Sequence, residues 1–88
     1  MEPIGFDMVV LREGKTFVAY SPELDLSSCG ASIEQARSNL KTAVRLFLEE
    51  AQKMGTLKDI LAEAGFQRDS SGKWSPPSLV ATELVELA

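Results

Sequence analysis

The spacing of apolar and polar positions predicts a β-rich N-terminal region followed by helices. Residues 6–11 are mostly apolar and partly β-branched, which favours a strand buried on much of both faces. Gly14 follows, where a tight turn needs positive φ. Residues 16–20 then return as a second strand, so the first twenty residues predict a β-hairpin.

A short third strand is predicted for residues 26–31. Pro22 has no amide proton and pushes Ser21 to extended geometry, so we expect strand pairing to end there before the chain turns back. Gly30 marks a tight bend or a close approach of two backbones.

The strongest pattern lies between residues 33 and 54. Ser32 is a good N-cap, Gln35 completes a capping box, and Gly55 stands where a helix C′ glycine belongs. Apolar residues recur at steps of three and four, which predicts one buried stripe: Ile33, Ala36, Leu40, Ala43, Val44, Phe47, Leu48, Ala51 and Met54. A helix of about 33 Å is as long as such a domain is wide, so we expect it to lie across the sheet.

The rest of the chain predicts smaller elements. Residues 56–64 form a second helix stopped by Gly65, and a Ser-Ser-Gly turn separates residues 66–67 from residues 73–74. After two prolines, residues 79–87 predict a final strand with one mostly apolar face. Such a strand would be an edge, where chains pair with copies of themselves.

Composition narrows the possible functions. The chain has 88 residues, which predicts one domain over residues 1–88 with a radius of gyration of about 12 Å. Its 9 Lys and Arg against 13 Asp and Glu give a net charge of −4, which argues against wrapping nucleic acid by charge and suits a basic partner. With no His and one Cys, catalytic triads and the usual zinc sites are excluded within the chain, and we expect no enzyme, cofactor or metal.

The chain carries no sign of export or membrane insertion. It has no signal-like N-terminus and no apolar run near the 20 or so residues that a membrane helix needs. We therefore expect a cytoplasmic protein.

Several segments between Phe17 and Ala51, and one beyond, carry a family resemblance. They are Phe17-Val18-Ala19-Tyr20-Ser21-Pro22-Glu23-Leu24, Gly30, Ser32-Ile33-Glu34-Gln35-Ala36, Asn39-Leu40-Lys41-Thr42-Ala43, Leu46-Phe47-Leu48-Glu49-Glu50-Ala51 and Leu61 with Ala64-Gly65-Phe66. In order and spacing these segments resemble HicB-type antitoxins.

The resemblance implies a fold and a partner. It implies an α+β fold, an antiparallel sheet with one long helix across it, described for the family as a degraded ribonuclease H-like fold. It also implies binding of a small basic HicA-type toxin, an RNA-cleaving protein whose active site the antitoxin blocks. Larger relatives add a DNA-binding domain, for which we expect no room after Leu87, so direct DNA binding is not expected.

Candidate partner-binding residues follow the second predicted strand: Tyr20, Pro22, Glu23, Leu24 and Asp25. An aromatic ring, a kink and two carboxylates suit the surface of a basic partner. Alternatively, Tyr20 and Leu24 fill the core and Pro22 merely ends the strand.

A second set of residues suggests nucleic-acid binding. Arg37, Lys41 and Arg45, with Lys53, follow one line on the long helix and could track phosphates, and Trp74 could stack on a base. Alternatively, the cations form a solvated face in which Glu49 joins Arg45 and Lys53 in a ladder, and Trp74 covers the edge of the core.

Two further residues invite a catalytic interpretation. Asp7 lies on the first strand, where ribonuclease H chemistry needs a carboxylate, and might converge with Glu34 or Glu49 on Mg²⁺; an exposed or edge Asp is favoured. Cys29 is favoured as a small core residue rather than a nucleophile, since there is no His to activate it.

Three functions remain open at this point. The first is a non-enzymatic module that binds and occludes a basic toxin, acting as a homo-oligomer paired through the C-terminal strand. The second is an RNA-binding or RNA-processing domain on a ribonuclease-like scaffold. The third is a structural oligomer without a toxin.

Overall fold

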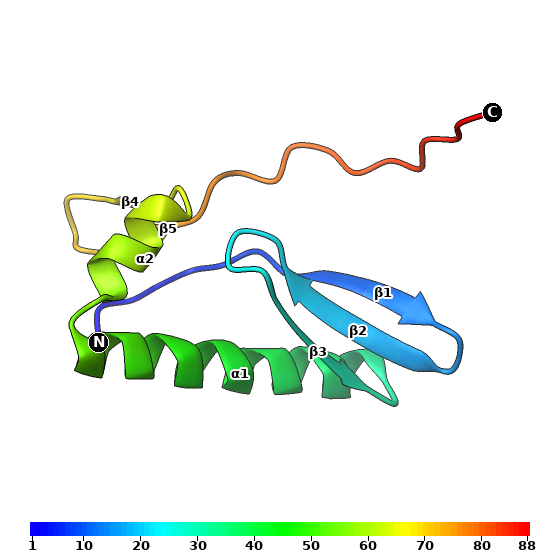
Figure 1. Ribbon diagram of the computed structural model, residues 1–88, viewed down its shortest axis with the longest axis horizontal. Coiled ribbons are helices and arrows are strands. Elements are labelled where there is room, and N and C mark those ends of the chain that lie inside the picture. Colours follow the sequence, from blue (N-terminus) through cyan, green and yellow to red (C-terminus); the bar gives the residue numbers. More distant parts are fainter.

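A computed structural model describes all 88 residues and has the predicted α+β class (Figure 1). A three-stranded antiparallel sheet precedes one long helix, which is followed by a short helix and a two-stranded hairpin. The elements are β1 (Val9–Glu13), β2 (Thr16–Ser21), β3 (Leu26–Gly30), α1 (Ile33–Met54), α2 (Leu57–Glu63), β4 (Gln67–Arg68) and β5 (Trp74–Ser75). In Figure 1, α1 lies along the long axis with the sheet packed over one half and α2 over the other.

The predicted hairpin is confirmed as β1 and β2. Val9 pairs with Tyr20 and Glu13 with Thr16, and Gly14 has φ 63° in the turn between them. The strand order β1-β2-β3 leaves β1 with a free outer edge. β1 begins at Val9 rather than at residue 6, so the residues before it run alongside the body without a ladder partner in this sheet.

The strand register separates two faces of the sheet. Directly opposed residues share a face, so Val10 and Ala19 lie together on one face and Leu11 and Val18 on the other. Val10 packs against the core and Ala19 is fully buried, which identifies theirs as the face under α1. The opposite face, here called the outer sheet face, carries Val9, Leu11, Val18, Tyr20 and Cys29, none of which belongs to the core.

Both ends of α1 are capped close to the prediction. The Ser32 hydroxyl accepts a hydrogen bond from the Gln35 amide at 3.0 Å. The Gln35 side chain accepts one from the Ala31 amide at 2.6 Å, one residue earlier than a standard capping box requires. Gly55 ends the helix with φ 76° in the left-handed region.

The buried side of α1 is narrower than predicted. Five residues of the predicted stripe are buried: Ala36, Leu40, Val44, Leu48 and Ala51. Ile33, Phe47 and Met54 are exposed, so their assignment to the core is wrong. Strands of five or six residues span less than about 20 Å, which is too short to cover both flanks and both ends of a 22-residue helix.

Gly30 lets β3 approach α1 closely. Of the two roles predicted for it, a tight bend or a close approach of two backbones, the structure shows the second. A Cβ atom at this position would lie 2.7 Å from the Ala36 nitrogen. The Asn39 side-chain amide also donates to the Cys29 carbonyl oxygen at 2.8 Å, which joins the same two elements.

The N-terminal segment completes the small hairpin. Ile4 bridges to Trp74 in parallel, the Trp74 amide donates to the Pro3 carbonyl at 2.9 Å, and the Gly5 amide donates to the Trp74 carbonyl at 3.0 Å. Phe66, just before β4, is buried in the same core as Leu61 of α2, so this end of the molecule extends the main core.

The predicted final strand is absent. Residues 79–87, here called the C-terminal arm, form no helix or strand, and Val80, Leu84 and Leu87 are each about nine-tenths exposed. The arm carries apolar side chains on both sides, mostly on one, and the rest of the chain covers neither side. It extends the molecule to 42 Å, with a radius of gyration of 14.5 Å instead of the expected 12 Å or so (Figure 1).

No helix of the protein combines the length and the apolar character needed to span a membrane.

Candidate protein-interaction surface

The predicted partner-binding residues lie on the connection between β2 and β3. Residues 22–25, here called the β2–β3 loop, form a turn that starts at an exposed proline, and the strand does end at Ser21. Asp25 closes the turn with φ 53°, a left-handed conformation that Asp tolerates better than most residues.

Hydrogen bonds hold this loop in place from both sides. The Tyr20 hydroxyl donates to Asp25 Oδ1 at 3.0 Å. The Asp7 amide donates to Glu23 Oε1 at 2.6 Å. Leu24 packs against the core, as its alternative interpretation predicted, while Tyr20 is only half-buried and belongs to the outer sheet face.

The loop is electrostatically negative. Its hydrogen bond to Asp25 raises the pKa of the Tyr20 phenol, and burial and the charges of Asp25 and Glu23 raise it further. No Lys or Arg pairs with these carboxylates, because the one ion pair of the chain joins Arg68 to Glu2. Each carboxylate therefore keeps oxygen lone pairs free for an external cation.

Asp7 belongs to this surface, although no local sequence pattern links it to the β2–β3 loop. It lines a shallow depression that also holds Pro22, Glu23 and the start of the C-terminal arm at Leu79. The hairpin register contains the signal. In each pair of opposed residues the two residue numbers add up to 29, so the same register extended past Val9 brings Asp7 opposite Pro22. Continuing the ladder two residues beyond β1 would have placed Asp7 beside the loop.

The basic residues form a separate surface on α1. Arg37, Lys41 and Arg45 line one depression that contains no apolar residue. The predicted ladder of Arg45, Glu49 and Lys53 is wrong, because no ion pair forms among them.

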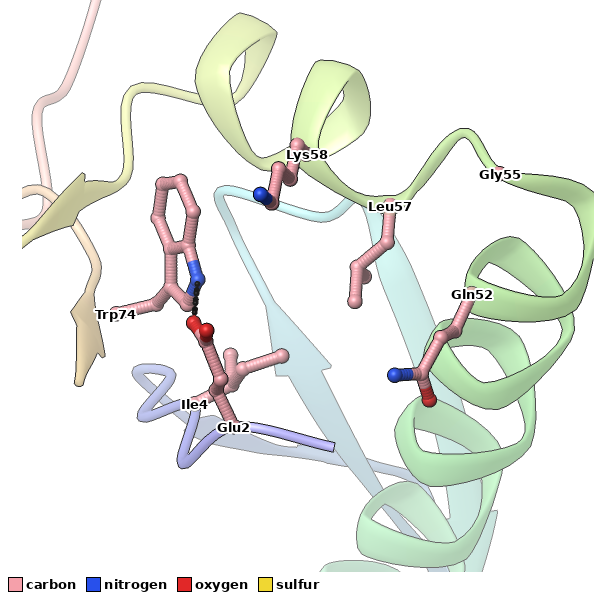
Figure 2. Close-up of a pocket in the computed structure, with 7 residues that line it drawn as sticks. All are labelled: Glu2, Ile4, Gln52, Gly55, Leu57, Lys58 and Trp74. Carbon is pink, nitrogen blue, oxygen red and sulfur yellow. Dashed lines mark hydrogen bonds between the residues drawn. The ribbon is translucent and has the colours of Figure 1, made fainter. Parts of the chain in front are cut away.

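Trp74 does not join that basic depression. Its indole nitrogen donates to Glu2 Oε2 at 3.0 Å (Figure 2). Arg68 binds the other carboxylate oxygen, Glu2 Oε1, at 2.7 Å. The ring packs against the core, so the prediction that it covers the core edge is confirmed. It also lines a cavity of about 250 Å³ with Leu57 and Lys58, which is below the roughly 300 Å³ at which small-molecule pockets begin.

The remaining catalytic candidates are dispersed. No three His, Cys, Asp or Glu side chains gather closely enough to hold a metal ion, so Asp7 is not part of a cluster of three such ligands. Cys29 is exposed on the outer sheet face, and its prediction as a core residue is wrong. The register causes this, since Cys29 lies opposite Val18 on the side away from α1.

A scan of protein-family models, a search of curated proteins and a search of solved structures find no match to this chain. The HicB resemblance and the ribonuclease H-like relation therefore stay predictions.

Proposed function

We propose that this protein is a non-enzymatic interaction module that binds and occludes a small basic RNA-cleaving toxin of the HicA type. One observation carries the proposal: the carboxylates of Glu23 and Asp25 lie on an anchored loop, with Asp7 beside them and no cation paired to any of the three. This loop lies at the strand end where the resemblance to HicB-type antitoxins is closest.

The proposed mechanism is steric occlusion guided by charge. A guanidinium or ammonium group of the toxin would bind the free carboxylate oxygens, and the rigid sheet behind the loop would cover the toxin's RNA-binding surface. Because hydrogen bonds already fix the loop, little conformational entropy is lost on binding.

Self-association in the cytoplasm is the second part of the proposal. Buried apolar residues are few for 88 residues, and the exposed C-terminal arm offers further apolar surface. We propose a homo-oligomer that forms through this arm and does not bind DNA directly.

Co-expression with the product of the adjacent reading frame tests the toxin proposal. We expect the two to co-purify, and the double variant Glu23→Gln/Asp25→Asn to weaken the complex about tenfold or more. Glu49→Gln/Glu50→Gln is the matched control, since it also removes two carboxylate charges, at exposed positions on α1. The proposal fails if the neighbour does not bind, or if both sets of variants bind equally well.

RNA binding is the second candidate function, favoured by the unpaired cations Arg37, Lys41 and Arg45 in one depression. Fluorescence anisotropy with a labelled single-stranded RNA would then show binding that falls steeply with salt and is lost in Lys41→Glu. Equal anisotropy for both proteins at low salt would eliminate this function.

A further inference from the structure

The C-terminal arm is the largest apolar feature left without a partner. Leu79, Val80, Leu84, Val85 and Leu87 are all exposed on one extended segment. Alternate residues of an extended chain point to opposite sides, so Leu79, Val85 and Leu87 make one side mostly apolar, while Val80 and Leu84 add apolar groups to the other. Glu83 and Glu86 also give the arm two negative charges.

A groove beside β1 has the complementary character. Its apolar wall comes from the N-terminal segment and β1, and its basic wall comes from α1; the lining residues are Ile4, Gly5, Phe6, Met8, Val10, Arg37 and Lys41. We call it the β1–α1 groove. No acidic residue lines it, and the ion pair of the chain lies elsewhere, so Arg37 and Lys41 are available to a ligand.

The groove also borders unpaired backbone. β1 is an edge strand, since β2 lies on one side and no strand on the other. A peptide that binds there gains main-chain hydrogen bonds from the edge and side-chain contacts from the groove. The C-terminal arm suits both the β1 edge and the groove, because it is already extended, apolar and acidic.

We propose that the C-terminal arm of one copy adds as a strand to β1 of a second copy and fills its β1–α1 groove. One set of arm side chains packs on Phe6, Met8 and Val10, while an arm glutamate approaches Arg37 and Lys41. The other set lies beside Val9 and Leu11, which extends the outer sheet face.

The occupant is a second copy rather than the chain's own arm. Within one chain the arm leaves the body beside Pro22 and Glu23, and both arm and groove stay uncovered although each is available to the other. A reciprocal exchange between two copies buries both arms and both grooves around one twofold axis, which doubles the stabilising contact. This inference develops the self-association part of the proposed function and is independent of toxin binding.

A charge exchange in the full-length chain tests the pairing. We expect the wild type to be a dimer at micromolar concentration by light scattering. The arm variant Glu83→Lys/Glu86→Lys and the groove variant Arg37→Glu/Lys41→Glu should each raise the dimer dissociation constant about tenfold or more, and an equimolar mixture of the two should dimerise again. Leu46→Glu, an exposed position on α1 that does not line the groove, is the control and should leave the constant unchanged.

A mixed dimer identifies the occupant. With methyl-labelled arm leucines and valines in one copy and an unlabelled second copy, we expect intermolecular NOEs from the arm to Phe6 and Met8. A monomeric wild type, arm variants that dimerise normally, or arm contacts that persist at concentrations where the chain is monomeric would each overturn the proposal. Toxin capture by the β2–β3 loop is measured separately with the Glu23 and Asp25 variants, so either proposal can fail alone.

Discussion

The β2–β3 loop and the C-terminal arm are both exposed segments that carry carboxylates, yet the fold treats them differently. The loop is fixed at Asp25 by Tyr20 and at Glu23 by the Asp7 amide. In the arm, by contrast, no residue makes a hydrogen bond, and the leucine side chains are exposed to solvent. Exposed segments therefore differ physically: the loop is ordered before it binds a partner, whereas the arm would gain order on binding.

The sharpest test of this contrast is the same substitution in the body and in the arm. Leu40→Ala should lower the free energy of unfolding by about 3 kcal/mol, because Leu40 is fully buried against the sheet. Leu84→Ala should change it by less than about 0.5 kcal/mol at concentrations where the chain is monomeric, since Leu84 is 89% exposed. Urea unfolding followed by circular dichroism measures both, and a large loss for Leu84→Ala would show that the arm packs on its own body.

A smaller loss is expected where β3 approaches the helix. Gly30→Ala should cost about 2 kcal/mol, because the new methyl group would overlap the α1 backbone at Gln35 and Ala36. Gly5→Ala is the control, since its methyl group would meet neighbours at 3.9 Å, an ordinary contact. Equal denaturation midpoints for the two variants would contradict the close approach.

A stabilising change is expected at the base of the loop. Ser21 is fully buried and its hydroxyl has no hydrogen-bond partner. Ser21→Ala removes this desolvated group and should raise the free energy of unfolding by about 1 kcal/mol. Thermal unfolding checks the sign, and a lower melting temperature would mean that the hydroxyl has a partner in solution.

The smallest effect is local and depends on pH. Hydrogen bonds from the Ser71 hydroxyl and from the backbone amides of Lys73 and Ser71 lower the pKa of Asp69 below its usual 3.8. A lowered folded-state pKa means that the stabilisation is present above that usual value and is lost as pH falls through the folded pKa. An amide NMR titration should show Ser71 and Lys73 shifting with a midpoint below 3.8.

Asp69→Asn is the reference for that titration and should abolish the shift. Arm amides should not respond to Asp69, since the carboxylate binds only its own turn. A midpoint at the usual value would show that the turn is open in solution.

Local sequence signals predicted much of the fold. Ser32, Gln35 and Gly55 carry short-range capping chemistry. Gly14 suits a left-handed turn position, and Gly30 permits a close approach that a Cβ atom would block, so these features appeared where expected. The error on Phe47 and Met54 has another origin: periodicity marks which side of a helix is apolar, but the extent of the sheet decides how much of it is covered.

The candidate surface was predicted less completely, for a related reason. Tyr20, Glu23 and Asp25 are close in sequence, and the structure joins them through the β2–β3 loop. Asp7 and the groove cations depend on contacts between distant segments, which no local pattern contains. The arm's apolar alternation was visible, but whether a strand forms depends on a partner strand, and residues 79–87 have none within one chain.

The Glu2 carboxylate has a consequence for the order of folding. Its bonds to Arg68 and Trp74 span 66 and 72 positions of the chain, far more than the contacts within the hairpin. Closing so long a loop costs more entropy than forming β1–β2 or capping α1, so native contacts at the N-terminus form late. Residues 2–4 are therefore among the last to reach their native place, and Ile4 is covered only once Trp74 lies beside it.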